Sequence, residues 1–497
     1  MLADVEDVVG FAVLVGVVCG VLVLGILSNN LAERIGVPAP AFFLVGAAVA
    51  SDLLPQIAPD SIEGVQRVVT VALVLILFNG GMDIGLAKFR RNGVAVAWVG
   101  VAGTFVTAGA LAAAAHGLLG MGWMLALLLG TALSPTDPAV VFSVLGKREI
   151  AGRSGTILQG ESGANDPVGI ALMVALLAAG SGEVKSLGGQ ALSVGVEFVL
   201  QMGIGAVVGV GGGWLLVRNM QRRALPGESL YPIRTLAAAG VIYAVATVAH
   251  GSGFLAVFVA GIIAGDARAP FKREVERFHG AVASLGEIVA FTVLGLTVQL
   301  RTLPQGDAWM HGLIIAVLLA FVIRPVLVGL VLWPIRLRRG ERIFVLWAGL
   351  KGAVPVLLGT YILTSKAGHQ IEAYDIVFVV VLFSVLVQGG LVPLVAKRLK
   401  LPMRMRRPEP WSLGLRFRDE PHGVHRFTVT PGAAADGASI EALSLGENVW
   451  VSLVERDGGL VQVRGGTQLK AGDGVVVLAE GQDVALVRRM FTSPTSR

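Results

Sequence analysis

The chain has 497 residues, of which 54% are hydrophobic and 15% are charged, and its formal net charge is +6. Soluble globular proteins carry about 25% charged residues, so this composition excludes that class and indicates an integral membrane protein. The positive charge does not point to nucleic acid, because the basic residues fall in short loops between apolar stretches. Cys19 is the only cysteine, which excludes an intrachain disulfide and a cysteine-based metal site.

Apolar stretches of spanning length recur along the first four-fifths of the chain. A helix needs about 20 residues to cross a hydrocarbon layer about 30 Å thick. The acidic N-terminus lacks the basic region of a cleavable signal peptide, so we expect the first span to remain in the mature protein. Thirteen spans are predicted at 8–27, 37–54, 63–82, 93–115, 121–145, 156–179, 190–217, 232–249, 251–265, 280–300, 308–333, 342–363 and 373–396.

Lys and Arg concentrate in one set of alternate loops, whereas the opposite set is nearly free of them and includes the acidic SDLLPQIAPDSIE. Because cytoplasmic loops are enriched in Lys and Arg, this pattern predicts an inner-membrane protein with its N-terminus outside and its C-terminus in the cytoplasm. We expect a membrane domain at 1–397, a basic linker at 398–420 that lies against an anionic inner leaflet, and a soluble domain at 421–497.

The last 77 residues differ in character from the rest. Short alternating runs, HRFTVT, NVWVSLVER, GLVQVR and GVVVLAE, are separated by glycine-rich turns, and GQDVALVRRMF follows with a helical pattern. Alternation with turn punctuation is typical of strands. We therefore expect a small α+β domain.

The sixth predicted span contains an unusual polar stretch, GESGANDPVG. In a helix, Glu161 and Asn165 share one face at a spacing of four, and Ser162 and Asp166 share the neighbouring face. A carboxylate at membrane depth is costly and usually faces a cavity or a partner. Asp166 is therefore the first candidate for binding a cation or a proton, while a polar cluster that only joins helices is the alternative.

Two predicted spans are interrupted. The fifth contains LSPTDPAVV, in which two prolines flank Thr136 and Asp137, and the twelfth contains AGLKGAVP, with Lys351 near its centre. Prolines remove helix hydrogen bonds and free carbonyl groups, which often bind cations in transporters; a simple proline kink is the alternative. Because the two spans run in opposite directions, we expect inverted repeats with two crossed, broken helices. The eleventh span adds Arg324, a natural structural partner for Glu161 or Asp137.

The charges in these spans suggest exchange at one site. These spans contain three acidic residues and two basic residues, so their net charge is −1. The five residues are Asp137, Glu161, Asp166, Arg324 and Lys351. One monovalent cation or one proton would neutralise that charge, and the empty charged site is the costly one to move through a low-dielectric barrier. Glu287 in SLGEIVAF complicates the sum and is paired, protonated or close to an aqueous cavity. The predicted ion-binding residues are Asp166, Asn165, Ser162, Thr136 and Asp137, whose carboxylate, hydroxyl and amide oxygens suit an alkali cation.

These motifs resemble those of the monovalent cation:proton antiporter-1 family, in its NhaP/CvrA-type branch. SPTDPAVV, GESGANDPVGIAL, the arginine in FVIRPV and AGLKGAVP carry the resemblance, which covers about residues 8–397. One departure is Lys351, where the family commonly has arginine. The tail is similar to a TrkA-C (RCK C-terminal) domain, which favours potassium/proton exchange over sodium/proton exchange.

The resemblance implies an all-α, NhaA/NhaP-like antiporter fold in a homodimer, with a dimerisation domain and a six-helix core domain that moves relative to it. Asp166 would be the carboxylate shared by cation and proton. Asn165, where electrogenic relatives have a second acid, would imply electroneutral one-for-one exchange. The positions that carry over as lining or organising the site are Thr136, Asp137, Ser162 and Glu161, with Arg324 as an internal ion-pair partner.

Two other classes of function lack their characteristic motifs in this chain. A ligand-gated cation channel would be supported by a selectivity-filter sequence such as TVGYG, which the chain lacks. A membrane-embedded enzyme would need a catalytic motif such as HExxH, which is also lacking, so we expect neither an enzyme nor a resident cofactor. A nucleotide or a cyclic dinucleotide is an expected effector of the tail by family analogy alone.

Overall fold

The computed structural model describes residues 37–497 with gaps at 146–147, 151–152, 182–186, 302, 304–305, 366–367, 402, 406–423, 446–448, 458, 480–482 and 493–497, together with four isolated positions before residue 37. The first predicted span, 8–27, and most of the predicted linker therefore lie outside the described residues. The chain divides into two compact units, Met1–Arg406 and Arg407–Arg497, which are described separately.

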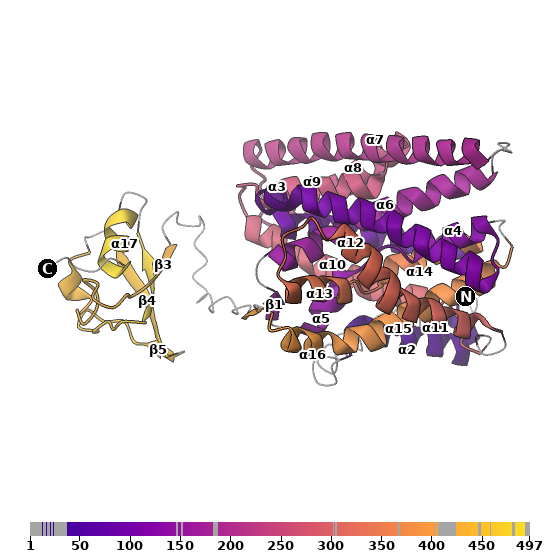
Figure 1. The fold of residues 1–497 in the computed structure, drawn as a ribbon. Coiled ribbons are helices and arrows are strands. Elements are labelled where there is room, and N and C mark those ends of the chain that lie inside the picture. Colours follow the sequence, from indigo (N-terminus) through magenta and orange to yellow (C-terminus); the bar gives the residue numbers. More distant parts are fainter. Residues whose placement is uncertain are drawn as a thin grey trace. The chain divides into compact units, whose positions relative to one another are not determined.

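The first unit is built almost entirely of helices (Figure 1). In chain order they are α2 (Ala39–Leu53), α3 (Ile62–Leu119), α4 (Trp123–Ala132), α5 (Pro138–Leu145), α6 (Arg153–Ser181), α7 (Leu187–Arg222), α8 (Leu230–Val248), α9 (Gly253–Gly265), α10 (Lys272–Gly295), α11 (Ala308–Leu318), α12 (Gly329–Val331), α13 (Arg339–Trp347), α14 (Ala353–Leu363), α15 (Gln370–Phe383) and α16 (Gly390–Arg398). Two π-helical segments, η3 (Leu319–Val328) and η4 (Ser384–Gly389), join α11 to α12 and α15 to α16. A short 3-10 turn, η1 (Pro55–Ile57), follows α2.

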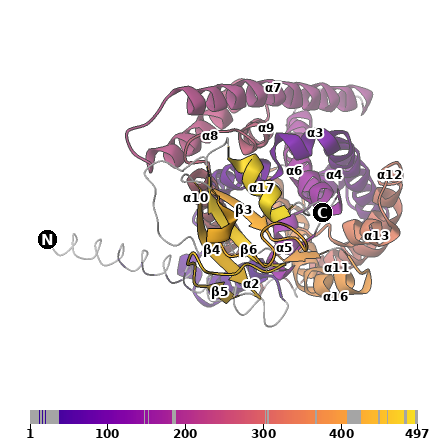
Figure 2. The same ribbon diagram turned by 90° about the vertical axis from the view of Figure 1, so that its left-hand side faces the viewer.

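These helices have the length and surface of membrane spans. Within the described residues, seven helices are long and apolar enough to cross a membrane, and four apolar helices are shorter. α7 runs along one edge of the helical bundle in both views (Figures 1 and 2), and its large apolar side chains, such as Leu192, Val199 and Val207, are exposed. Such a surface suits lipid rather than water. The count of thirteen spans stays a prediction.

The longest helix, α3, contains a break at one glycine. A straight helix of 58 residues would be about 87 Å long, roughly three times the hydrocarbon thickness of a membrane. Gly85 has φ +66°, a left-handed conformation that favours glycine, and the backbone there is not helical. The Asp266 carboxylate, at the end of α9, accepts a hydrogen bond from the Ala87 amide just after the break. The two predicted spans 63–82 and 93–115 are the two halves of this helix.

Both predicted interruptions are confirmed. Residues 133–137 separate α4 from α5, and residues 348–352 separate α13 from α14. The two interruptions meet, because the Asp137 amide donates a 2.8 Å hydrogen bond to the carbonyl of Leu350. Segments more than 200 residues apart in sequence thus form one unwound region inside the helical unit.

A small strand pair was not expected from the sequence. β1 (Arg148–Ile150), between α5 and α6, pairs antiparallel with β2 (Met403–Met405), with Arg148 opposite Met405 and Ile150 opposite Met403. Residues 403–405, within the predicted linker, thus form a strand that pairs inside the first unit. β2 belongs to the first unit because the α5–α6 connection offers it a strand edge for backbone hydrogen bonds.

The second unit is a small α+β domain, as predicted. Its four-stranded antiparallel sheet has the order β3 (Val424–Thr428), β6 (Gly474–Leu478), β4 (Trp450–Arg456) and β5 (Gly459–Val461). α17 (Val484–Thr492) packs on the sheet (Figure 2), where Phe491 stacks against Phe427 of β3. Inward-facing residues, including Val454, Val475 and Val477, form a separate hydrophobic core.

Candidate functional site

The four polar residues of the sixth predicted span lie on α6 and are all buried. Glu161, Ser162, Asn165 and Asp166 have exposed fractions of 3%, 6%, 3% and 8%. α6 continues through Pro167, so the predicted i,i+4 arrangement of two polar pairs is present. Four buried polar groups on one helix need partners or ligands, since burying them alone is costly.

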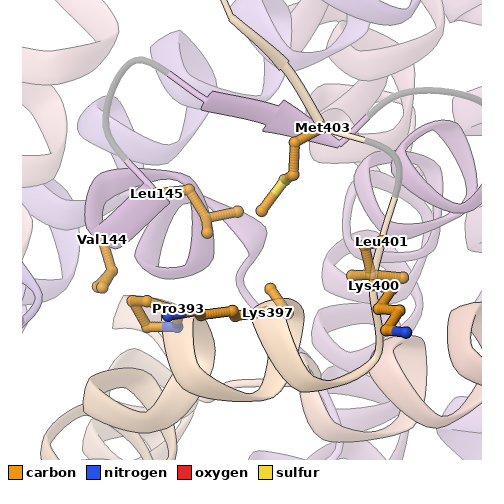
Figure 3. A pocket seen from close by; sticks show the side chains of 8 residues that line it. Val144, Leu145, Pro393, Lys397, Lys400, Leu401 and Met403 are labelled. Atoms are coloured by element: carbon orange, nitrogen blue, oxygen red, sulfur yellow. The ribbon is translucent and has the colours of Figure 1, made fainter.

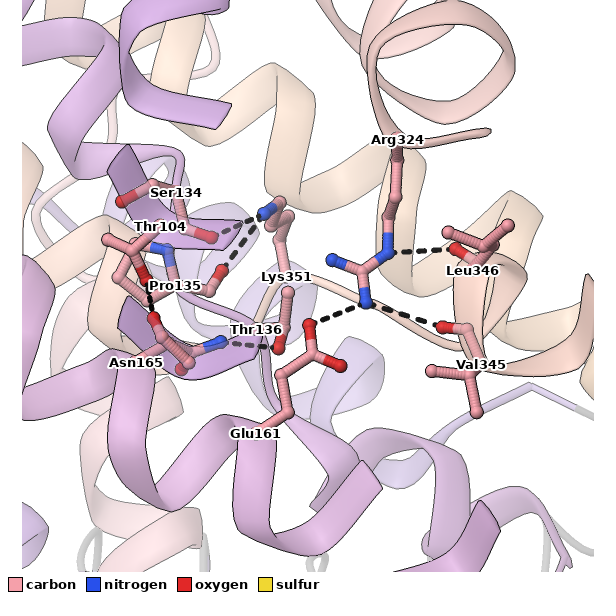
Figure 4. Close-up of polar contacts among 11 residues, drawn as sticks. Thr104, Ser134, Pro135, Thr136, Glu161, Asn165, Arg324, Val345, Leu346 and Lys351 are labelled. Carbon is pink, nitrogen blue, oxygen red and sulfur yellow. Dashed lines mark hydrogen bonds and ion pairs between the residues drawn. The ribbon is translucent and has the colours of Figure 1, made fainter. Parts of the chain in front are cut away.

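Asn165 links α6 to the interruption after α4. Its Nδ2 donates a 2.7 Å hydrogen bond to the Thr136 hydroxyl oxygen, and both side chains are buried (Figure 4). The Oδ1 atoms of Asn165 and Asp166 are also buried, but they have no hydrogen-bond partner among the described residues. Two buried acceptor oxygens on neighbouring residues, without donors, are the kind of ligand that an alkali cation uses.

Asp137 lies between the N-termini of two half-helices. Its Oδ1 accepts a 2.8 Å hydrogen bond from the Ala139 amide at the start of α5. A Cβ atom on Gly352, directly before α14, would collide with the Asp137 carboxylate, so the absence of a side chain there permits the close approach. A negative charge at helix N-termini is stabilised by the unpaired amide groups there. Asp137 therefore has a clear structural task.

Lys351 supplies the matching positive charge. Its ammonium donates to the carbonyl oxygens of Ser134 at 3.1 Å and Pro135 at 3.0 Å, just beyond the C-terminal end of α4 (Figure 4). The side chain is 1% exposed, and its backbone amide donates to the Ser384 hydroxyl in η4. The unpaired carbonyl groups at a helix C-terminus carry partial negative charge, so a cation there is stabilised, just as an anion is stabilised at an N-terminus.

Arg324 pairs with Glu161 rather than with Asp137, which decides between the two partners that the sequence allowed. Its Nη2 lies 2.8 Å from Glu161 Oε1, and both side chains are almost fully buried. The guanidinium also donates to the carbonyl oxygens of Leu346 at 2.8 Å and Val345 at 3.3 Å, in the last turn of α13. Arg324 thus stabilises the second broken helix while it neutralises an acid on α6.

The contacts divide the site charges into compensated and uncompensated groups. Glu161 is offset by Arg324, and Asp137 and Lys351 occupy opposite ends of the broken helices. Glu161 Oε2 and Asp166 Oδ1 are both buried without a hydrogen bond within the described residues. Because Arg324 already offsets Glu161, Asp166 is the α6 carboxylate that has no ion pair within the described residues. The arrangement can bind one monovalent cation or one proton at that carboxylate, and neutralise the site in either case.

Two predicted site residues, Ser162 and Glu287, make fewer contacts with the site than the others do. Ser162 is buried on α6 beside Glu161, and its side chain has no hydrogen bond to either interruption within the described residues. Glu287 is half-buried on α10, near enough to Asp137 for their charges to repel.

Sequence reasoning missed Gly352 and Ser384, which contact the site through a close approach and a hydrogen bond. Gly352 stands inside the noted AGLKGAVP interruption, so its sequence offered a signal. Ser384 follows an ordinary apolar run and offered none.

Comparison with known proteins matches both units to families. The sodium/hydrogen exchanger transmembrane family matches residues 11–398, and the TrkA-C domain matches residues 424–492. The chain is similar to the K(+)/H(+) antiporter NhaP of Alkalimonas amylolytica, with 32% identity over 96% of this chain and 83% of that protein. It is also similar to the K(+)/H(+) antiporter NhaP2 of Shewanella sp. strain MR-4, with 30% identity over 94% of this chain and 81% of that protein.

Solved structures support the fold. An electron-microscopy structure of the sodium proton antiporter MjNhaP1 from Methanocaldococcus jannaschii matches with a TM-score of 0.66 at 21% identity, covering 80% of this chain and 99% of that one. A structure of the same antiporter at pH 8 gives a TM-score of 0.65, covering 76% and 98%. The predicted membrane antiporter fold and the prediction that the chain is not an enzyme are confirmed. The chain belongs to the sodium/hydrogen exchanger family and is a multi-pass membrane cation/proton antiporter of the NhaP type with a C-terminal TrkA-C domain.

Proposed function

We propose that this antiporter exchanges K⁺ for H⁺ one for one, with Asp166 as the carboxylate that holds either ion in turn. The observation that carries the proposal is the pair of buried acceptor oxygens on Asn165 and Asp166, neither of which has a donor within the described residues. Relatives named K(+)/H(+) antiporters at about 30% identity favour potassium.

The fixed charges support electroneutral exchange. Arg324 offsets Glu161, and Asp137 and Lys351 lie at opposite ends of the broken helices, so one added positive charge neutralises Asp166 whether it is a cation or a proton. Asn165 is uncharged, so the neighbouring position adds no second titrating group. Cation and proton then compete for the same oxygen, and the site crosses the membrane loaded with one of them.

The cation ligands in this proposal are Asp166, Asn165 and Thr136, with Ser162 beside them on α6. The Thr136 hydroxyl oxygen accepts from Asn165, which orients the Asn165 carbonyl oxygen away from Thr136 and leaves it available to the ion. Glu161, Arg324, Lys351 and Asp137 hold the broken helices in place and do not contact the ion directly in this assignment.

We also propose an orientation in the membrane, an oligomeric state and a role for the TrkA-C unit. The loop charges favour an external N-terminus and a cytoplasmic C-terminus in the inner membrane. By family resemblance the protein works as a homodimer by alternating access, and its TrkA-C unit regulates exchange in response to a nucleotide or cyclic dinucleotide.

Reconstituted liposomes with a lumenal pH dye test the proposal. Adding K⁺, Na⁺ or Li⁺ to the wild type should move protons with the membrane potential clamped, with the largest response to K⁺. Asp166→Asn should abolish this movement. Glu197→Gln provides a matched control, because Glu197 is a carboxylate on α7 that hydrogen-bonds Gln201 away from the site.

The outcomes separate the candidates. If Na⁺ moved more protons than K⁺, the substrate would be sodium rather than potassium, as the name of MjNhaP1 states for that antiporter. Cation flux without counter-moving protons, unchanged in Asp166→Asn, would overturn exchange and favour a channel. Equal loss in Glu197→Gln would show that removing any membrane carboxylate damages the protein.

A further inference from the structure

A cavity of about 270 Å³ lies between the end of the last membrane helix and the strand pair (Figure 3). Leu145 of α5, Ala396 of α16 and Met403 of β2 contribute to its mostly apolar wall. Lys397 and Lys400 also line it, and both side chains are exposed to solvent. The cavity is therefore amphipathic, with an apolar wall and a cationic rim.

The segment that forms the α16 side of this cavity carries only positive charges. Residues 376–408 contain six Lys or Arg residues and no Asp or Glu. The ammonium groups at the rim therefore have no acid on their own segment to neutralise them. An anion is the complementary partner, and lysine is a common point-charge ligand of phosphate.

The position of the cavity favours a lipid over a free anion. α16 closes the last membrane-spanning stretch, Gln370–Arg398, so Lys397 and Lys400 stand where that stretch leaves the hydrocarbon layer. Phospholipid phosphates lie at this depth, with acyl carbons directly beneath them. Six of the eight lining residues are apolar and suit lipid carbons, for which a free phosphate ion has no counterpart.

We propose that this cavity binds the phosphate-bearing end of an anionic phospholipid. Lys397 and Lys400 bind the phosphate, and the wall formed by Leu145, Ala396 and Met403 takes the first carbons of the lipid. The volume accommodates this part of the molecule, while the remaining chains stay in the bilayer.

The site joins three segments of different function. α5 begins directly after Asp137, α16 ends the membrane domain, and β2 precedes the TrkA-C unit in the chain. A bound lipid would therefore contact both α5, which follows the ion site in the chain, and β2, which pairs with β1. We expect binding to protect the β1–β2 hydrogen bonds against exchange with solvent.

The experiment measures binding and is independent of transport. Full-length protein is stripped of lipid in mild detergent, and its unfolding temperature is followed during titration with phosphatidylglycerol, phosphatidylcholine of the same chains, or inorganic phosphate. Phosphatidylglycerol should raise the unfolding temperature in a saturable way, and the other two probes should have little effect.

Two variants remove different halves of the site. Lys397→Gln/Lys400→Gln removes the cations, and Ala396→Leu fills the apolar wall while it leaves both lysines in place. Each should raise the half-maximal phosphatidylglycerol concentration at least five-fold. Arg222→Gln/Arg223→Gln, at the exposed end of α7, removes the same charge elsewhere and should leave the titration unchanged.

The contrary results are distinct. An unchanged titration in both site variants would overturn the proposal, as would an equal response of the wild type to phosphatidylcholine. A response to inorganic phosphate alone that depends on the two lysines would overturn the lipid assignment and identify a free-anion site. If Ala396→Leu does not fold, the lysine variant still decides, because its substitutions are at exposed positions.

Discussion

Arg324 and Glu161 form an ion pair at 2.8 Å in which both side chains are almost fully buried. Removal of one partner leaves an uncompensated buried charge, which costs about 3–5 kcal/mol. Glu161→Gln should therefore lower the unfolding temperature strongly, and Glu161→Gln/Arg324→Gln should recover part of the loss. Thermal unfolding in detergent measures both effects.

The exposed pair of Glu63 and Arg67, 3.5 Å apart on α3, is the control for this prediction. Solvent-exposed ion pairs contribute little to stability, so Glu63→Gln should leave the unfolding temperature nearly unchanged. If Glu161→Gln were as mild as Glu63→Gln, the buried pair would not stabilise the broken helix.

Thr136 is predicted to set the affinity for the cation in two ways, as a ligand and as the hydrogen-bond acceptor that positions Asn165. Thr136→Val removes the acceptor of the Asn165 amide and leaves a buried donor unsatisfied, at a cost of about 1–3 kcal/mol. The half-saturating cation concentration for exchange in liposomes should rise several-fold, while Thr136→Ser should behave like the wild type. Equal affinity in Thr136→Val would mean that Asn165 is not positioned by this hydrogen bond.

Gly85 should tolerate no side chain. Gly85 has φ +66° and ψ +163°, a region almost restricted to glycine, so alanine there costs about 1–3 kcal/mol, and its Cβ atom would also lie 2.6 Å from Asp266 Oδ1. Gly85→Ala should therefore lower the unfolding temperature. Gly80→Ala, on the same helix in open space, should keep or raise it, since alanine is the better helix former. An equal fall in unfolding temperature in Gly85→Ala and Gly80→Ala would show that the helix break has no special requirement for glycine.

The TrkA-C unit should lose stability in acid through Asp473. Arg456 donates to both oxygens of this buried carboxylate at 2.8 Å, and these hydrogen bonds hold the pKa of Asp473 below its usual value. A depressed pKa in the folded state contributes stability above the unfolded pKa of about 3.9, and this contribution is lost as the pH falls through the lower, folded value.

Thermal unfolding of residues 421–497 between pH 7 and pH 2 measures this effect. Asp473→Asn should be less stable than the wild type at pH 7, and the difference should disappear toward pH 2. Asp457→Asn, at an exposed turn, should follow the wild-type curve throughout. A constant difference between wild type and Asp473→Asn at all pH values would contradict a role for the charge.

The sequence predicted those features of the site that are local. The spacing of Glu161, Asn165 and Asp166 follows from helix periodicity, and the two interruptions follow from proline and from polar residues in apolar spans. It also predicted the strands of the C-terminal unit, because alternation and glycine turns are short-range signals.

Other features depend on contacts between distant segments and could not be predicted. Arg324 had two possible acids, and only the packing of η3 beside α13 and α6 selects Glu161. The π-helical turns that contain Arg324 and Ser384 have no clear sequence pattern. β2 is only three residues long within a basic segment, and it becomes a strand because β1 is beside it.

The pairing of β2 with β1 also shortens the tether of the C-terminal unit. Only residues 406–423 connect Met405 to the first strand of that unit, and a fully extended segment of this length spans at most about 60 Å. Whatever conformation the connecting residues adopt, the covalent chain alone sets this upper limit on the distance between the end of β2 and the start of β3.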